Sequence, residues 1–243
     1  MKSIANEPGR LIPCLTIDGN RLVKTRKFEI FKYLGDPINA INIFNNFYVD
    51  ELIIIDITRN STDLDSKLIM ARQIANQALM PISYGGGINS ELMIVDLFRI
   101  GFDKIILKGL LSNTMLVKKM VSVYGSQAFS ACIEVQIREN QYLINGIMMS
   151  LNQTIELVNS YIQLGIGEVF LNYRDLDGTR CGLSNDNLSS NLIESFNIPV
   201  IVCGGASTKQ EAESYVKVSS LVSVAASSIF TLYGKNDAVI LNY

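Results

Sequence analysis

Short apolar runs rich in β-branched residues recur along the chain, and the segments between them mix polar and apolar residues at helical spacing. The apolar runs predict strands at residues 11–15, 51–55, 80–84, 104–107, 128–133, 168–172, 200–203 and 221–225. The other segments predict helices at residues 37–48, 66–77, 91–100, 115–123, 154–164, 185–196 and 209–217. Continuous apolar strands are typical of a parallel sheet covered on both faces. The alternation therefore predicts an α/β fold, a single-domain (β/α)8 TIM barrel over residues 1–243.

The two halves of the chain carry similar polar and glycine residues after their strands when one half is shifted by about 118 residues against the other. The shift brings together Thr16 and Glu134, Asp56 and Asp175, Gly86-Gly87 and Gly204-Gly205, and Lys108-Gly109 and Ala226-Ser227. This predicts a two-fold repeat of half-barrels. Because the loops that follow barrel strands meet at one face, the two halves would present equivalent sites across one mouth. Such a mouth suits a ligand with an anion at each end.

The charge balance argues against a polyanionic partner. The chain has 21 basic and 23 acidic residues and a formal net charge of −2, so we expect no binding of nucleic acid. No apolar run reaches the roughly 18 residues that span a bilayer, and the first ten residues, MKSIANEPGR, lack the apolar centre of a signal peptide. These features predict a cytoplasmic protein without membrane insertion.

The chain has no histidine, which removes the commonest general base and the commonest metal ligand. Acid-base chemistry would therefore fall to carboxylates, lysine, tyrosine or cysteine, and we expect neither a metal site nor a cofactor. Cys14, Cys132 and Cys203 lie in apolar strand-like runs, and Cys181 lies in a polar loop. Since no Cys-x-x-Cys spacing occurs, we expect four reduced thiols.

Glycine-rich turns follow two of the predicted strands, in the sequences YGGGI (84–88) and CGGAS (203–207), and VAASS (224–228) follows the last strand. Such turns let successive backbone N–H groups approach an anion, although each could also be a plain tight turn. Their symmetric placement favours anion binding. The candidate phosphate-binding residues are Lys24, Gly86, Gly87, Lys108, Gly109, Gly178, Gly204, Gly205, Ala226 and Ser227.

Carboxylates end several strands or follow them closely, and these are the candidate catalytic groups. Asp56 and Glu134 end apolar runs, while Asp175 and Asp177 lie in the polar loop NYRDLDGTRCG (172–182). Burial against apolar neighbours would favour proton uptake by such carboxylates; alternatively they cap helices, pair with lysines or form an Asp-Gly turn. Thr16 ends the first strand with a hydroxyl.

A loop is expected after Thr16, and it carries a run of basic residues, Arg21, Lys24, Arg26 and Lys27, before Phe28. One interpretation is a solvated basic surface. Because the loop lies beside the candidate phosphate sites, the other interpretation is a mobile lid over an anionic ligand.

The phrases RLIPCL, RLVK, GDP, VDELIIIDIT, YGGGI, DKI, YGSQA, DLDGT, CGGA and AASSIF together resemble the cyclase subunit of imidazole glycerol phosphate synthase, HisF, over essentially the whole chain. The resemblance implies a TIM barrel that pairs with a HisH-like glutaminase. Ammonia released by the glutaminase would enter at the amino-terminal face of the barrel. At the mouth it would react with a bis-phosphorylated substrate.

The resemblance also assigns roles to residues. Two aspartates perform the family's acid-base work, and Thr16 and Glu134 stand at their positions here, so the family's cyclisation is doubtful for this chain. The four charges of the family's ammonia gate match Arg10, Glu51, Lys104 and Glu168. The alternative is a charged floor that only stabilises the barrel. Asp103 matches a position that faces the glutaminase.

The segments LVKTRKFEIFKYLGDPINAINIFN and LYGKNDAVILNY resemble HisF paralogues of surface-polysaccharide gene clusters, the WbuZ-type glycosyl-amidation-associated proteins. This resemblance implies a subunit of a glutamine-dependent system that converts an acetamido sugar into an acetamidino sugar. Its partners would be a glutaminase, a sugar amidotransferase and a phosphorylated or nucleotide-linked small molecule. Two alternatives stay open: a working cyclase subunit of histidine biosynthesis, and a non-catalytic scaffold that activates a glutaminase.

Overall fold

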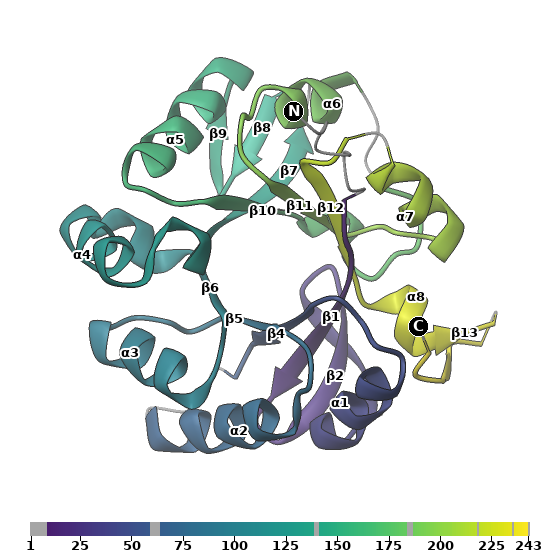
Figure 1. The fold of residues 1–243 in the computed structure, drawn as a ribbon. Helices are drawn as coiled ribbons and strands as arrows, with labels where there is room; N and C mark the ends of the chain where they lie inside the picture. The colour runs from purple at the N-terminus through teal and green to yellow at the C-terminus, as the bar shows by residue number, and fades with distance from the viewer. Residues whose placement is uncertain are drawn as a thin grey trace, which may run out of the picture.

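The computed structural model describes residues 9–58, 64–138, 141–183, 187–217, 219–234 and 236–242. Its centre is a closed barrel of eight parallel strands, seen end-on in Figure 1. The barrel strands are β1 (Leu11–Asp18), β4 (Leu52–Asp56), β5 (Ile82–Gly85), β6 (Lys104–Leu107), β7 (Phe129–Arg138), β10 (Glu168–Tyr173), β11 (Val200–Cys203) and β12 (Val222–Ala226). Each pairs with the next, and β12 pairs with β1 to close the ring. The predicted (β/α)8 barrel and all eight predicted strands are confirmed.

Helices surround the barrel (Figure 1). Those in the described residues are α1 (Pro37–Asn46), α2 (Leu64–Gln77), α3 (Glu91–Ile100), α4 (Thr114–Tyr124), α5 (Leu151–Gln163), α6 (Asn187–Glu194), α7 (Lys209–Val216) and the short α8 (Ser228–Thr231). The predicted start of the sixth helix, residues 185 and 186, lies outside the described residues. α5 begins three residues before its prediction because Ser150 and Gln153 form a reciprocal capping box. Short 3-10 helices occupy Gly109–Ser112, Ser126–Ala128 and Arg174–Leu176.

Each half of the barrel begins with a strand that continues into an antiparallel hairpin above the mouth. β1 pairs with β2 (Arg21–Arg26), which pairs with β3 (Glu29–Gly35). In the second half β7 pairs with β8 (Gln141–Ile144), which pairs with β9 (Ile147–Met149). The two hairpins follow the predicted half-barrel repeat. The loop predicted after Thr16 is therefore wrong, because most of its residues form β2 and β3.

Two hydrophobic clusters hold the barrel together. The larger lies between the strands and the helices. The smaller fills the inside of the barrel, and its buried members are Ile12, Cys14, Ile53, Ile106, Phe170, Ile201 and Ala225. The inner residues alternate with the outer ones along each strand, as the two-residue period of a strand requires. The floor and mouth of the barrel are thus separated by a packed apolar layer.

The C-terminal segment adds a small sheet of β13 (Leu232–Tyr233) and β14 (Ala238–Val239) beside α8. Among the helices in the described residues, none combines the length and the apolar character needed to cross a bilayer.

Candidate active site

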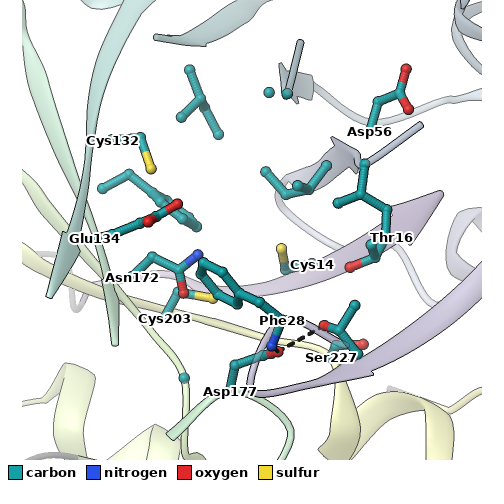
Figure 2. A pocket seen from close by; sticks show the side chains of 18 of the residues that line it. Cys14, Thr16, Phe28, Asp56, Cys132, Glu134, Asn172, Asp177, Cys203 and Ser227 are labelled. Carbon is teal, nitrogen blue, oxygen red and sulfur yellow. Dashed lines mark hydrogen bonds between the residues drawn. The ribbon is translucent and has the colours of Figure 1, made fainter. Parts of the chain in front are cut away.

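A cavity of about 680 Å³ opens at the carboxyl ends of the barrel strands, and every one of the eight strands contributes to its wall. Figure 2 shows this cavity with its labelled side chains. All ten candidate phosphate-binding residues line it, as do four of the five candidate catalytic residues, Thr16, Asp56, Glu134 and Asp177. Most of the residues predicted from the sequence therefore lie in one physical site at the ends of all eight barrel strands.

Thr16 and Glu134 stand on opposite walls of the cavity, on β1 and β7 (Figure 2). Glu134 forms an ion pair with Lys108, which directly follows β6. The backbone of Glu134 is held by Asn145 in the second hairpin, whose Oδ1 accepts its N–H and whose own N–H donates to its carbonyl, both at 3.0 Å. The hairpin thus fixes the position of a carboxylate whose counter-charge comes from a neighbouring strand end.

Asp56, at the end of β4, is buried, and its carboxylate has three partners among the residues that the structure describes. The Tyr84 hydroxyl donates to Oδ2 at 2.7 Å, the Thr58 N–H donates to Oδ1 at 2.8 Å, and Lys67 Nζ lies 3.9 Å from Oδ2. Burial, together with the Asp56 charge and the hydrogen bond to it, raises the pKa of the Tyr84 hydroxyl far above its ordinary value of 10.0. The Tyr84 hydroxyl therefore stays protonated and holds the Asp56 carboxylate in place through its hydrogen bond.

Asp177 anchors the tip of the first hairpin to the loop after β10. Its carboxylate accepts from Thr25 Oγ1 at 2.8 Å and from the Phe28 N–H at 3.1 Å, with Lys24 Nζ at 3.5 Å. Its carbonyl accepts from the Lys27 N–H at 2.9 Å. Lys24 is only 2% exposed, so the predicted solvated basic surface is wrong at this residue. The aromatic ring of Phe28 projects into the cavity (Figure 2).

Asp175 is the one candidate catalytic residue that lies outside the cavity wall. Its Oδ1 accepts from Gln136 Nε2 at 2.7 Å, and its Oδ2 lies 3.3 Å from Arg138, both on the upper part of β7. The shift of about 118 residues between the two halves brings Asp175 together with Asp56. The 3-10 turn Arg174–Leu176 nevertheless directs the Asp175 side chain to the rim.

The glycine turns are set by close backbone packing. A Cβ at Gly86 would lie 2.0 Å from the carbonyl oxygen of Asp56, and one at Gly205 would lie 2.1 Å from that of Gly182. Both residues also have positive φ, at 102° and 92°. On the wall beside them, Ser227 Oγ is buried and has no hydrogen-bond partner within the described part of the chain. A buried hydroxyl of this kind is available to an anionic ligand.

The amino-terminal ends of the barrel strands form the floor of the barrel. There the four predicted gate residues converge in a closed ring. Each cation touches both acids. Arg10 contacts Glu51 and lies 2.8 Å from Glu168, and Lys104 lies 2.8 Å from Glu168 and 3.6 Å from Glu51. The two glutamates are each 4% exposed, and the Ser83 hydroxyl also donates to Glu51 at 2.8 Å. This mutual pairing compensates the cost of burying the charges.

Asp103 precedes β6 at the same face and is exposed. Its Oδ2 accepts the Ile82 N–H at 2.8 Å, and its own N–H donates to the Ile82 carbonyl. Asp103 therefore orders the entry to β5 and still presents its charge on the floor surface.

Comparison with known proteins identifies the family. Residues 10–236 match the family model of histidine biosynthesis proteins. A Pseudomonas aeruginosa protein, provisionally named imidazole glycerol phosphate synthase subunit hisF2, is 34% identical over 96% of this chain and 95% of its own. For the Vibrio vulnificus protein provisionally named subunit hisF3 these values are 33%, 96% and 92%. The Chlorobium phaeobacteroides HisF subunit is 30% identical, over 91% and 89%.

The chain belongs to the HisF family. Within this HisF barrel the described residues contain no group of three or more His, Cys, Asp or Glu side chains arranged to hold a metal ion. The side chains that line the cavity supply hydroxyl, carboxylate and ammonium groups.

Three thiols line the upper lumen of this HisF-family barrel, and all four cysteines are free. Burial, and after it the charge of Glu134, raises the pKa of the Cys132 thiol to about 12. A hydrogen bond with Cys14, followed by burial, holds the pKa of Cys203 well above 9.0. The Cys132 and Cys203 thiols are therefore neutral at physiological pH and contribute a weakly polar surface to the wall.

Sequence reasoning missed several residues that shape the HisF site. Tyr84 and Lys67 hold Asp56, and Thr25 holds Asp177. These contacts join distant segments, and no local spacing indicates them. Glu211 is different, because it follows Thr208 in the spacing of a capping box, a signal that was present in the sequence.

Proposed function

We propose that this HisF-family protein is the ammonia-accepting barrel subunit of a glutamine-dependent amidotransferase system. The single observation that carries the proposal is the closed ring of Arg10, Glu51, Lys104 and Glu168 at the floor, directly below the apolar interior of the barrel, several of whose residues also line the cavity. Ammonia is small and neutral, so an apolar lumen suits its passage while charged ions are excluded. For ammonia to pass, the Arg10 or Lys104 side chain would have to move away from Glu51 and Glu168.

A HisH-like glutaminase is the proposed partner at the floor. Exposed apolar side chains lie in the connections that enter the strands there: Tyr48 is 89% exposed, Leu79 85%, Leu221 41% and Phe47 39%. A group of exposed apolar residues around a charged centre is typical of a protein interface. Asp103 adds a charge at its edge. The partner would release ammonia directly over the ring.

The mouth is the proposed site for an anionic substrate. Two glycine turns, Lys108 and the Ser227 hydroxyl, which has no hydrogen-bond partner among the described residues, face one cavity. Thr16 cannot accept a proton at neutral pH without a separate base, so the two-aspartate cyclisation is not the favoured reaction. We therefore propose amidation of a phosphorylated or nucleotide-linked acetamido sugar, together with a sugar amidotransferase, for surface-polysaccharide synthesis. The free thiols suit a reducing cytoplasm.

A cyclase subunit of histidine biosynthesis is the second candidate, because Glu134 presents a carboxylate in the cavity and all ten candidate phosphate-binding residues line the same cavity. Introducing the gene into a host that lacks its own cyclase subunit separates the two. Growth without histidine would favour the cyclase. Absence of growth from soluble protein would favour amidation.

The main proposal is tested with amide-15N-glutamine, the glutaminase and the sugar amidotransferase, in the presence of unlabelled ammonium. We expect the product to carry 15N with little dilution, because ammonia travels inside the barrel. Lys104→Met should reduce glutamine-dependent product more than ammonium-dependent product. Full dilution of the label by bulk ammonium, with no difference between Lys104→Met and wild type, would instead indicate a scaffold that only activates the glutaminase.

A further inference from the structure

The two halves of the barrel differ in charge at equivalent points of the mouth. Glu134 on β7 lies beside Lys108 at the end of the neighbouring β6, and the two form an ion pair. In the other half the equivalent positions are Thr16 on β1 and Ala226 at the end of the neighbouring β12. One side of the mouth thus carries a charged pair and the other carries two small neutral groups.

The Lys108–Glu134 ion pair is open to the cavity. The Lys108 side chain is 46% exposed and that of Glu134 is 20% exposed, and both line the cavity wall. Partly exposed ion pairs are weak, and the four-carbon stem of lysine lets its ammonium group change partners. An anion that enters the cavity can therefore compete with Glu134 for Lys108.

The place where such an anion would lie is next to Lys108. β5 and β6 pair in register, with Gly85 opposite Ile106, so the glycine turn after β5 and Lys108 after β6 are neighbours. Gly86 and Gly87 both have positive φ. Successive backbone N–H groups in such turns form concave anion sites. A second ammonium, that of Lys67, lies beside Gly87, 2.5 Å from where its Cβ would be.

A phosphate group suits this turn better than a carboxylate does. It carries more charge and more acceptor oxygens, and it can bind backbone N–H groups and an ammonium group at the same time. Glu134 is fixed to its strand and offers only its two oxygens to Lys108. Lys108 would therefore gain by moving from Glu134 to a phosphate bound at the turn.

We propose that the Lys108–Glu134 ion pair is a ligand-operated switch: a phosphate group bound at the Gly86–Gly87 turn takes Lys108, and the released Glu134 becomes the proton acceptor of the cavity. This inference rests on the proposed binding of an anionic substrate. It identifies Glu134 as a base that is masked until that substrate has bound.

Loss of the ion pair with Lys108 would change the affinity of Glu134 for a proton, because of what surrounds this carboxylate. The charges of Glu134 and Lys108 act in opposite directions on the pKa of the buried Cys132 thiol, so both are felt in the same small volume of the upper lumen. A carboxylate that loses its counter-charge beside an apolar wall gains affinity for a proton. Ammonia that arrives from the lumen would therefore meet an unpaired Glu134 carboxylate only when phosphate is bound.

The test is a thermodynamic cycle with inorganic phosphate, titrated calorimetrically into the full chain. Lys108→Met should weaken phosphate binding by about 10-fold or more, because a charged hydrogen bond is lost. Glu134→Gln should strengthen it by about 2- to 5-fold, because Lys108 no longer has a competing partner. The double variant should bind like Lys108→Met. As a matched control, Asp96→Asn removes a carboxylate from the Asp96–Arg99 pair outside the cavity and should not change binding.

The outcomes distinguish failure of the ion-pair switch from failure of the proposed binding of an anionic substrate. Equal phosphate affinity in wild type and Glu134→Gln, or a Glu134→Gln gain that persists in the double variant, would overturn the switch alone. Absence of phosphate binding to every folded variant, judged by circular dichroism, would overturn the anionic-substrate proposal and the switch together. Carboxyl-13C glutamate labelling gives a second readout: phosphate should shift the Glu134 resonance in wild type, and the shift should be largely lost in Lys108→Met.

Discussion

The backbone N–H of Phe28 donates to the carboxylate of Asp177 at 3.1 Å, and this bond ties the tip of the β2–β3 hairpin to the loop after β10. Both tip residues, Lys27 and Phe28, have positive φ, at 53° and 69°. Non-glycine residues pay for that conformation, so the turn depends on contacts that hold it. Asp177 supplies those contacts from its side chain and its carbonyl.

Removing this anchor should loosen the hairpin. We expect Asp177→Ala to lower the free energy of unfolding by about 2 kcal/mol, because Thr25 Oγ1 and the Phe28 N–H lose their acceptor. Urea unfolding measures the loss, and amide exchange of Phe28 should become faster. Asp175→Ala is the control in the same loop: its partners are at the exposed rim, and its effect should stay within about 1 kcal/mol. Equal effects of the two changes would contradict the anchoring role.

The charged ring at the floor makes a second prediction. Lys104→Met leaves Arg10 as the one counter-charge for the two buried glutamates among the described residues, so we expect it to destabilise the protein by about 3 kcal/mol. Because Glu168 shares the network, the double variant Lys104→Met/Glu168→Gln should lose less than the sum of the single variants. Denaturant unfolding of all three variants checks this. Lys119→Met breaks the exposed 2.7 Å pair with Glu91 and should cost at most about 0.5 kcal/mol.

The exposed apolar residues of the floor give a third prediction. Tyr48→Asp and Leu79→Asp should each weaken binding of the glutaminase by about 10-fold or more, since buried apolar anchors dominate interfaces. Calorimetry or surface plasmon resonance with the purified partner measures the affinity. Met115→Asp changes an equally exposed apolar residue in the first turn of α4, which follows a strand's carboxyl end, and should leave binding intact. Weakening by Met115→Asp to the same degree would place the interface elsewhere.

The barrel could be predicted from sequence because its signal is local and repeated. Each strand is a continuous apolar run, and each intervening helix has its own spacing and caps, as Ser90 shows for α3. The first hairpin could not be recognised in the same way. Its two-residue turn is Lys27-Phe28, whereas such turns normally carry Asn or Gly. The second hairpin turns at Asn145-Gly146, which is the usual signal, and could have been predicted.

The site shows the same division. The ends of the strands predicted which residues share the mouth, because parallel strands bring those ends together. The partners of each side chain depend on contacts between distant segments. Lys24 looked like part of a solvated basic run, yet it is buried against Asp177. Asp175 looked equivalent to Asp56, yet one short helical turn directs it to the rim. Sequence position fixed the neighbourhood of these groups but not their direction.

Glu211 joins two of the mouth loops and makes stability depend on pH. Its Oε1 accepts the Leu183 N–H at 2.8 Å, and its Oε2 accepts the N–H and the hydroxyl of Ser207 at 2.8 and 2.7 Å. Burial acts to raise the pKa of this carboxyl, but the hydrogen bonds from Ser207, Leu183 and Thr208 outweigh it and hold the pKa below 4.5.

The folded-state pKa of Glu211 lies below its unfolded value. At pH values around these two pKa values, the unfolded chain therefore binds more protons than the folded chain. The stabilisation is complete at pH values above the unfolded pKa and is lost as pH falls through the folded pKa. Glu211→Gln removes this titration, so the stability difference between wild type and variant should shrink as pH is lowered from about 7 to about 3. Urea midpoints across that range measure it. Glu156→Gln, at an exposed position of α5, controls for loss of one charge. A difference that stays constant with pH would mean that the Glu211 hydrogen bonds do not distinguish the two protonation states.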